Sequence, residues 1–106
     1  PLSRSEIQTI VQLQLNQLVK NLEEQNGIQI EISEQALEWL SELGFDPAYG
    51  ARPLKRVIQR KVLNELAKLI LDEKINPNSP VLIDCVNRCI EFFQNGERIG
   101  PEGLKN

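Results

Sequence analysis

The chain has 106 residues, 41% of them hydrophobic and 25% charged, which is typical of one globular domain. Its formal net charge of −3 and its lack of histidine argue against general affinity for nucleic acid and against a histidine-based catalytic or metal site. No hydrophobic stretch is long enough to cross a bilayer and no secretory leader is visible, so we expect a cytoplasmic protein, and the missing initiating methionine predicts a piece of a longer one.

The first predicted element is a helix that begins after Ser3 and ends at Gly27. Ser3 and Glu6 have the spacing of a capping box, in which each side chain accepts a hydrogen bond from the other residue's backbone N–H. Leu2 is expected to contact Ile7 across this cap. Gly27 can adopt the left-handed conformation that ends many helices. One hydrophobic stripe follows at helical spacing: Ile7, Val11, Leu15, Leu18 and Leu22.

A strand and two further helices are predicted next. Residues 28–32 alternate hydrophobic and polar side chains, which predicts a half-buried strand. Ser33 can cap a second helix that ends at Gly44, and Pro53 fits the first position of a third helix that runs to about Asp72. The residues expected to face inward are Ala36, Leu37, Leu40 and Leu43 in the second helix, and Leu54, Ile58, Val62, Leu66, Leu69 and Ile70 in the third.

The last third of the chain is predicted to consist of strands. Two strands, residues 81–85 and 88–93, are expected to form a hairpin that turns at Val86-Asn87. Asn95-Gly96 indicates another turn. A single sheet covered on one face by helices is the simplest arrangement of these elements.

The predicted fold class is therefore α+β, with three helices packed against a small, roughly three-stranded sheet. We expect one domain over residues 1–99, followed by a disordered tail over residues 100–106, where glycine and proline are frequent.

The start of the third helix carries the first candidate functional residues, Arg52, Lys55 and Arg56. The helix dipole already places partial positive charge there, so cations are the destabilising choice. Such a cluster can hold an anion, and phosphate is the usual one. A solvated basic turn, neutralised by nearby carboxylates, is the alternative, and charge alone does not exclude it.

Four other side chains have two interpretations each. Ile10 and Leu13 fall outside the hydrophobic stripe of the first helix, either as scattered exposed residues or as a second contact face toward another domain or a flat ligand. Trp39 and Tyr49 are either packed at the edge of the core or exposed as docking anchors.

The two cysteines, Cys85 and Cys89, have no histidine or further cysteine with which to complete a zinc site. We expect them to be small hydrophobic residues of the sheet. Nor does the sequence contain a Gly-x-x-x-x-Gly-Lys-Ser/Thr phosphate-binding loop or a nucleophile with a base beside it, so we expect no catalysis by this chain alone.

The most specific motif spans residues 44–59, which read Gly-Phe-Asp-Pro-Ala-Tyr-Gly-Ala-Arg-Pro-Leu-Lys-Arg-Val-Ile-Gln. This stretch closely resembles a signature of the Clp/HSP100 ATPases. The resemblance covers roughly residues 1–93, and residues 62–67 resemble the ClpB type more than ClpC or ClpA. It implies the C-terminal small (lid) subdomain of the second AAA+ module of a ClpB-type chaperone ATPase.

The resemblance also implies roles for individual residues. Arg52 would be the sensor-2 arginine, which reaches the γ-phosphate of ATP held by the large subdomain of the same parent chain. Ala51 would lie near the adenine, Gly50 would let the backbone approach the nucleotide, and Ile10 or Val11 would supply a hydrophobic contact to the adenine.

The implied parent protein is an ATPase that forms a homohexamer in the cytoplasm. It would bind ATP or ADP with magnesium mainly through the large subdomain and, together with an Hsp70 system, would unfold or disaggregate misfolded proteins under stress. Leu13, Lys55 and Arg56 would belong to interfaces with the large subdomain or with neighbouring protomers. We expect neither nucleic acid nor a membrane as a partner.

Two other functions remain open at this point. The same lid could come from a protease-partnered ClpC or ClpA unfoldase. Alternatively, the chain could be a freestanding protein-interaction or oligomerisation module in which Arg52 forms a structural ion pair. A freestanding module would keep its activity when isolated, whereas a lid would show no appreciable ATP affinity without its large subdomain.

Overall fold

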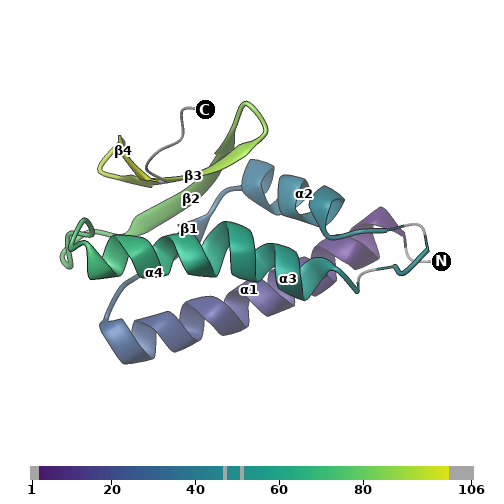
Figure 1. The fold of residues 1–106 in the computed structure, drawn as a ribbon, viewed down its shortest axis with the longest axis horizontal. Coiled ribbons are helices and arrows are strands. Elements are labelled where there is room, and N and C mark those ends of the chain that lie inside the picture. Colours follow the sequence, from purple (N-terminus) through teal and green to yellow (C-terminus); the bar gives the residue numbers. More distant parts are fainter. Residues whose placement is uncertain (1–2, 47, 51, 101–106) are drawn as a thin grey trace.

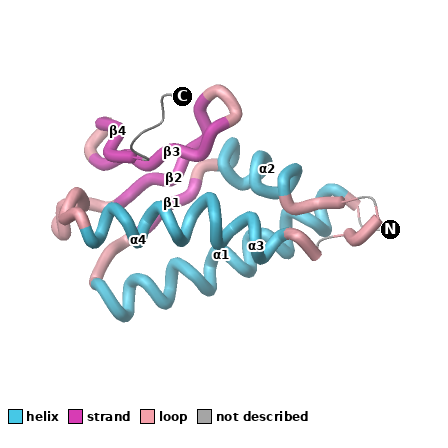
Figure 2. Tube along the Cα trace, viewed as in Figure 1, coloured by secondary structure: helices cyan, strands magenta, loops and turns pink. Residues whose placement is uncertain are grey.

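The structure is a computed structural model that describes residues 3–46, 48–50 and 52–100. Its helices cover one face of a four-stranded sheet (Figures 1 and 2). In chain order the elements are α1 (Arg4–Asn26), β1 (Ile30–Ile32), α2 (Glu34–Leu43), α3 (Leu54–Ile58), the π-helical turn η1 (Gln59–Leu63), α4 (Asn64–Leu71), β2 (Val81–Val86), β3 (Cys89–Gln94) and β4 (Glu97–Gly100).

The predicted capping box of α1 is confirmed. The Glu6 backbone N–H donates to the Ser3 hydroxyl at 3.2 Å, and the Ser3 N–H donates to the Glu6 carboxylate at 2.8 Å. Gly27 ends the helix in the left-handed conformation, with φ 69°, and its N–H donates to the Glu23 carbonyl. Leu2, predicted to contact Ile7, lies outside the described residues.

The α+β class is confirmed, but the sheet has four strands instead of three. Their order is β1-β2-β3-β4, with β1 parallel to β2 and the other pairs antiparallel. The strand that the sequence did not predict is β4, which follows the predicted Asn95-Gly96 turn and ends at Gly100. The sheet therefore continues one residue into the predicted tail, because the buried Gly100 packs against Leu69, where a Cβ atom would lie only 2.9 Å from Leu69 Cδ2.

Two predicted boundaries were wrong by one or two residues. β1 begins at Ile30, although Ile28 before it is buried. The hairpin between β2 and β3 turns at Asn87-Arg88, not at Val86-Asn87, because Val86 still pairs with Cys89. Asn87 and Arg88 both have positive φ, 52° and 62°, as the two-residue hairpin turn that matches strand twist requires.

The third predicted helix is present from Leu54 to Leu71, but it divides into α3, the π-helical turn η1 and α4. Pro53 is the cap residue before α3 and not its first helical residue. From Gln59 to Leu63 the helix widens into a π-helical turn, and the Asn64 N–H donates to the Gln59 carbonyl five residues back. Such a turn inserts an extra residue, and π-helical turns are frequent at functional sites.

The core lies between the helices and the inner face of the sheet. All the predicted inward-facing residues are at least half-buried: Leu18, Leu37, Leu43 and Ile70 are half-buried, and the others are buried. The sheet contributes the buried side chains of Val81, Ile83, Ile90 and Phe92. Within the described ranges, no helix has the length and hydrophobicity needed to span a membrane.

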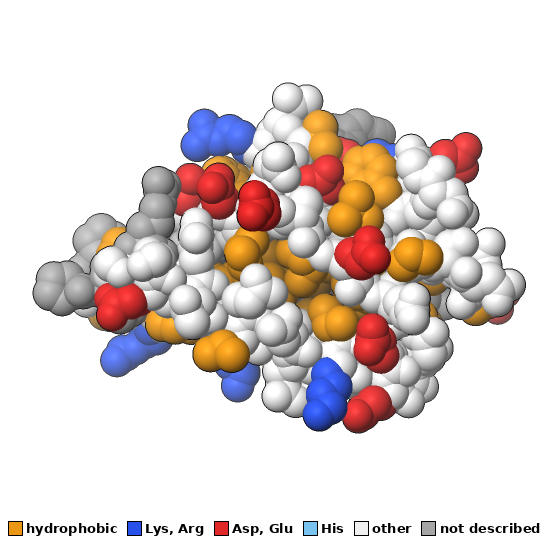
Figure 3. All heavy atoms as spheres, turned by 180° about the vertical axis from the view of Figure 1, so that it is seen from behind, with side chains coloured by type: hydrophobic (Ala, Val, Ile, Leu, Met, Phe, Trp, Pro, Cys, Tyr) orange, Lys and Arg blue, Asp and Glu red, His pale blue; other side chains and the backbone are white. Residues whose placement is uncertain are grey.

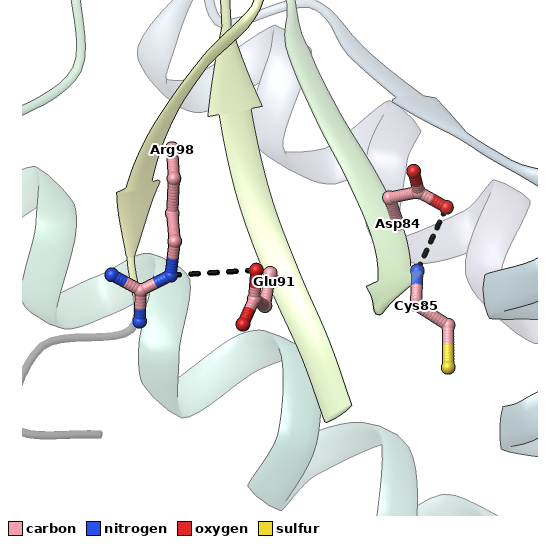
Figure 4. A network of polar contacts seen from close by, with 4 residues as sticks. All are labelled: Asp84, Cys85, Glu91 and Arg98. Carbon is pink, nitrogen blue, oxygen red and sulfur yellow. Dashed lines mark hydrogen bonds and ion pairs between the residues drawn. The ribbon is translucent and has the colours of Figure 1, made fainter. Parts of the chain in front are cut away.

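Polar contacts connect the start of α2 to the sheet. Ser33 caps α2 by accepting a hydrogen bond from the Ala36 N–H at 3.0 Å, and its hydroxyl donates to Asp84 Oδ1 at 2.6 Å. The same carboxylate oxygen accepts from the Cys85 N–H at 2.8 Å, as Figure 4 shows. Figure 4 also shows the ion pair that joins β4 to β3, between Arg98 Nε and Glu91 Oε1 at 3.4 Å.

Candidate functional site

The loop between α2 and α3 closes on itself before Arg52. The backbones of Asp46 and Gly50 exchange two hydrogen bonds, at 2.8 and 2.6 Å. The Asp46 carboxylate also accepts from the N–H groups of Ala48, at 2.7 Å, and Tyr49, at 3.1 Å. Gly50 closes this turn with φ 65°, a conformation that costs a residue with a Cβ atom about 1–2 kcal/mol.

Arg52 lies directly after the closed turn, and both its backbone and its side chain contact Tyr49. Its backbone N–H donates to the Tyr49 carbonyl at 3.2 Å, and its guanidinium lies 5.8 Å from the centre of the Tyr49 ring. Both side chains face solvent, Tyr49 with 62% of its surface exposed. Tyr49 is therefore not a core-edge residue. Its ring gives the arginine a cation–π partner that restricts where the guanidinium can lie.

An open cavity of about 480 Å³ lies beside Arg52 and is the candidate site. We call it the Arg52 cavity. The described residues that line it are Tyr49, Arg52, Pro53, Lys55, Arg56 and Gln59. The lining thus brings together the three cations predicted from the sequence and contains no carboxylate. The lining fits an anion, because each guanidinium offers a planar fork of N–H donors suited to phosphate oxygens.

The position of this cavity depends on the packing of Leu54 against Gly44. Leu54 is completely buried at the first turn of α3. Gly44, at the end of α2, leaves the space that this side chain fills: a Cβ atom there would lie 2.5 Å from Leu54 Cδ1 and 3.1 Å from the Leu54 Cα. The two helices can therefore approach closely enough to fix the start of α3.

The predicted contact residues of α1 have different environments. Val11 has 0% of its surface exposed, so it cannot face a ligand outside this domain, and of the two alternatives only Ile10 has accessible surface. Leu13 is 63% exposed, as expected for a residue outside the stripe. None of the three lines the Arg52 cavity. Ala51 lies outside the described residues.

A second cavity, of about 370 Å³, was not predicted from the sequence. It lies between α2, the helix around η1 and the β2–β3 hairpin, and we call it the Trp39 cavity. Trp39 packs partly against the core, as the first of its two interpretations held, and Arg88 lies over its ring at 5.2 Å. The other lining residues are Leu43, Arg60, Lys61 and Ile90, together with Glu65 and Cys89. The presence of Trp39 was the only sequence signal for this cavity.

The two cysteines are both free and differ in accessibility. Cys85 is half-buried on β2 and Cys89 is exposed on β3. Because Cys85 pairs with Ile90 while Cys89 pairs with Val86, the two side chains lie on opposite faces of the sheet, which disfavours a disulfide between them. Within the described ranges, no group of three His, Cys, Asp or Glu residues is placed to hold a metal ion.

We expect the two thiols to react at different rates. Burial raises the pKa of the Cys85 thiol, so its thiolate fraction at about pH 8 is lower than that of an ordinary cysteine. A maleimide should therefore label Cys89 first, and labelling of Cys85 should increase only at higher pH. Mass spectrometry of Cys85→Ser and Cys89→Ser chains measures the two rates separately. Equal rates would contradict the assigned burial.

Comparison with known families shows which family this chain belongs to. A family model described as the C-terminal D2-small domain of ClpB protein matches residues 2–83. "Chaperone protein ClpB" of Vibrio vulnificus (strain YJ016) is 48% identical over 81 residues, 76% of this chain and 9% of the relative. Proteins of the same name from Porphyromonas gingivalis and Rickettsia typhi are 44% identical over 92 residues and 51% identical over 82 residues.

The Porphyromonas match covers 87% of this chain and 10% of the relative, and the Rickettsia match covers 77% and 9%. The chain thus spans about a tenth of the length of these curated relatives. The match includes the closed turn, the residues of the Arg52 cavity and Trp39. It also favours ClpB over the ClpC or ClpA alternative. The chain belongs to the family of C-terminal D2-small domains of ClpB proteins.

Proposed function

We propose that this chain is the lid of the second ATPase module in a ClpB-type protein disaggregase, and that Arg52 contacts the γ-phosphate of ATP held by the large subdomain of the same parent chain. The observation that carries this proposal is the Arg52 cavity, which gathers three cations and, among its described residues, no carboxylate. The three positive charges repel one another, and a nearby anion would offset that repulsion.

The site suits an arginine that reports on the nucleotide. A guanidinium stays charged at every physiological pH and can donate two parallel hydrogen bonds to phosphate oxygens. The Tyr49 ring limits the positions that Arg52 can take before any ligand arrives. When ATP becomes ADP, Arg52 loses its partner, and the angle between lid and large subdomain can change. Lys55 and Arg56 add positive potential along the same approach.

The remaining contacts would come from α1, from Gly50 and from parts of the parent protein that lie outside this chain. Ile10, with its partly exposed side chain, would be the hydrophobic neighbour of the adenine, and the exposed Leu13 would lie against the large subdomain or the next protomer. Gly50 would allow the backbone to approach the nucleotide. Magnesium and most phosphate contacts would belong to the large subdomain. Six such protomers would form the ring that acts, with an Hsp70 system, on misfolded proteins in the cytoplasm.

The proposal is tested by ATP turnover of the parent chain with Arg52→Ala and Arg52→Lys. We expect Arg52→Ala to lower turnover about tenfold or more, since one lost charge-assisted contact to a reacting phosphate costs about 1.4 kcal/mol or more. Arg52→Lys should recover only part of the loss, because lysine lacks the fork.

Arg60→Ala is the matched control, since Arg60 lies on the same helix but lines the Trp39 cavity. It should leave turnover within about twofold of wild type. Unchanged turnover in a folded Arg52→Ala protein would show that Arg52 is a solvated or structural residue.

A further inference from the structure

We propose that the Trp39 cavity docks an acidic segment of a partner protein that carries an aromatic side chain. The cavity is separate from the Arg52 cavity, and the inference does not rest on the nucleotide role proposed above. Three parts of the chain that are distant in sequence form it: α2 supplies Trp39, the β2–β3 hairpin supplies Arg88, and the helix that contains η1 supplies Arg60, Lys61 and, at the start of α4, Glu65.

The charge of the lining favours an acidic occupant. Arg60, Lys61 and Arg88 face one carboxylate, that of Glu65, which already pairs with Lys68 at 3.6 Å. Among the described residues, no carboxylate forms an ion pair with any of the three cations. Three cations around one concave surface repel one another, and an incoming carboxylate relieves that repulsion.

The hydrophobic part of the lining favours an aromatic ring. Leu43, Ile90 and the partly buried Trp39 give the cavity a hydrophobic component. The Arg88 guanidinium lies over the Trp39 ring at 5.2 Å, and an aromatic ring of a partner that stacked on the other face of the guanidinium would extend this cation–π contact. Aromatic side chains and arginines are the residue types that contribute most to binding at protein interfaces.

The backbone brings the three cationic residues to the same cavity. Arg88 occupies the second position of a tight hairpin turn with φ 62°, an unusual conformation for a residue with a side chain. The π-helical turn, another departure from regular structure, presents the adjacent residues Arg60 and Lys61 to the same cavity. π-helical turns are frequent at functional sites, which is consistent with a binding role for this cavity.

A second copy of this chain fits the cavity less well. Tyr49 is the only described aromatic residue that is largely exposed, and its neighbour in space is the cation Arg52. The most exposed large hydrophobic residue, Leu71 at 81%, precedes Asp72 and Glu73 but offers no ring. On the face turned away from the viewer of Figure 1, hydrophobic side chains gather at the centre with acidic groups around them (Figure 3), so the self-association of the chain is measured below. We assign the cavity to a different protein because the single largely exposed aromatic ring among the described residues, that of Tyr49, is already stacked with a cation.

Trp39 is the single tryptophan of the 106-residue chain, so its fluorescence reports on the cavity directly. The probe is a blocked peptide, Asp-Glu-Phe-Asp-Glu, titrated into this chain, and the comparison peptide is Asn-Gln-Phe-Asn-Gln. We expect a saturable change in emission with a Kd on the order of 0.1–1 mM for the acidic peptide, at least about fivefold weaker binding of the neutral one, and weaker binding as salt rises.

Charge-reversal variants test whether the acidic peptide binds in the Trp39 cavity. Arg60→Glu and Lys61→Glu should each raise the Kd of the acidic peptide by about fivefold or more. Lys20→Glu, the same kind of charge reversal at an exposed position of α1, should leave that Kd within about twofold of wild type. Far-UV circular dichroism confirms that each variant is folded.

Three results would overturn the proposal. One is the absence of a saturable signal, and another is equal binding of the two peptides. The third is self-association of the chain, measured by sedimentation, that Lys61→Glu abolishes, because a second copy would then occupy the cavity.

Discussion

Phe92→Ala is expected to lower the free energy of unfolding by about 3–5 kcal/mol, the largest effect of any single change considered for this domain. Phe92 is the largest of the fully buried side chains among the described residues, with 0% of its surface exposed. It lies on β3, one of the two central strands, and its side chain is part of the core between the sheet and the helices. Removing its ring loses the transfer free energy of the ring and leaves a cavity that the surrounding helices fill only in part.

A domain of this size has a total stability of about 5–15 kcal/mol, so the variant should unfold at a much lower urea concentration than wild type. The matched control is Phe93→Ala. Phe93 is the next residue on the same strand, but it points to the outer face of the sheet and is half-buried. Its loss should cost clearly less than that of Phe92. Equal losses at the two positions would contradict the assigned register of β3.

Gly44→Ala is expected to destabilise the domain by about 1–3 kcal/mol through steric overlap. The backbone of Gly44, with φ −88° and ψ 0°, is one that alanine can adopt, so conformational strain is not the cause. The added methyl group would lie 2.5 Å from Leu54 Cδ1 and 3.1 Å from the Leu40 carbonyl oxygen, and one of these groups must move.

Because Leu54 begins α3, the movement should also displace Arg52. ATP turnover of the parent protein should therefore fall by a few fold in Gly44→Ala, even where the domain remains folded. Gly27→Ala is the control for a glycine in open space: apart from its chain neighbours, no atom of the described residues lies within 4 Å of its Cβ position, and only its φ of 69° opposes the change. It should cost about 1–2 kcal/mol of stability and leave turnover intact. Normal stability of Gly44→Ala would mean that α2 and α3 do not approach as closely as described.

The features that the sequence predicted well depend on neighbouring residues. The capping box of Ser3 and Glu6 and the helix end at Gly27 follow from local rules that tertiary contacts did not override. The clustering of Arg52, Lys55 and Arg56 was also predictable, because the three lie within one helical turn or next to it.

The features that were missed depend on residues far apart in the chain. The four-residue strand β4 is too short for a hydrophobic pattern of its own and is defined by pairing with β3 and by packing of Gly100 on Leu69. The Trp39 cavity combines α2, η1 and the hairpin, which no sequence spacing brings together. Helical periodicity placed Val11 in the hydrophobic stripe and Ile10 outside it, and the complete burial of Val11 agrees with that placement.

Equilibrium binding of nucleotides to the parent protein tests most directly whether Arg52 distinguishes ATP from ADP, as proposed above. A slowly hydrolysed ATP analogue and ADP should be titrated into wild type, Arg52→Ala and Arg60→Ala, with oligomer mass measured in each. We predict that Arg52→Ala weakens binding of the ATP analogue by about tenfold or more and changes the affinity for ADP by less than about threefold. Arg60→Ala should change neither affinity. An Arg52→Ala protein that is folded and assembled and still prefers the ATP analogue as strongly as wild type would contradict the claim.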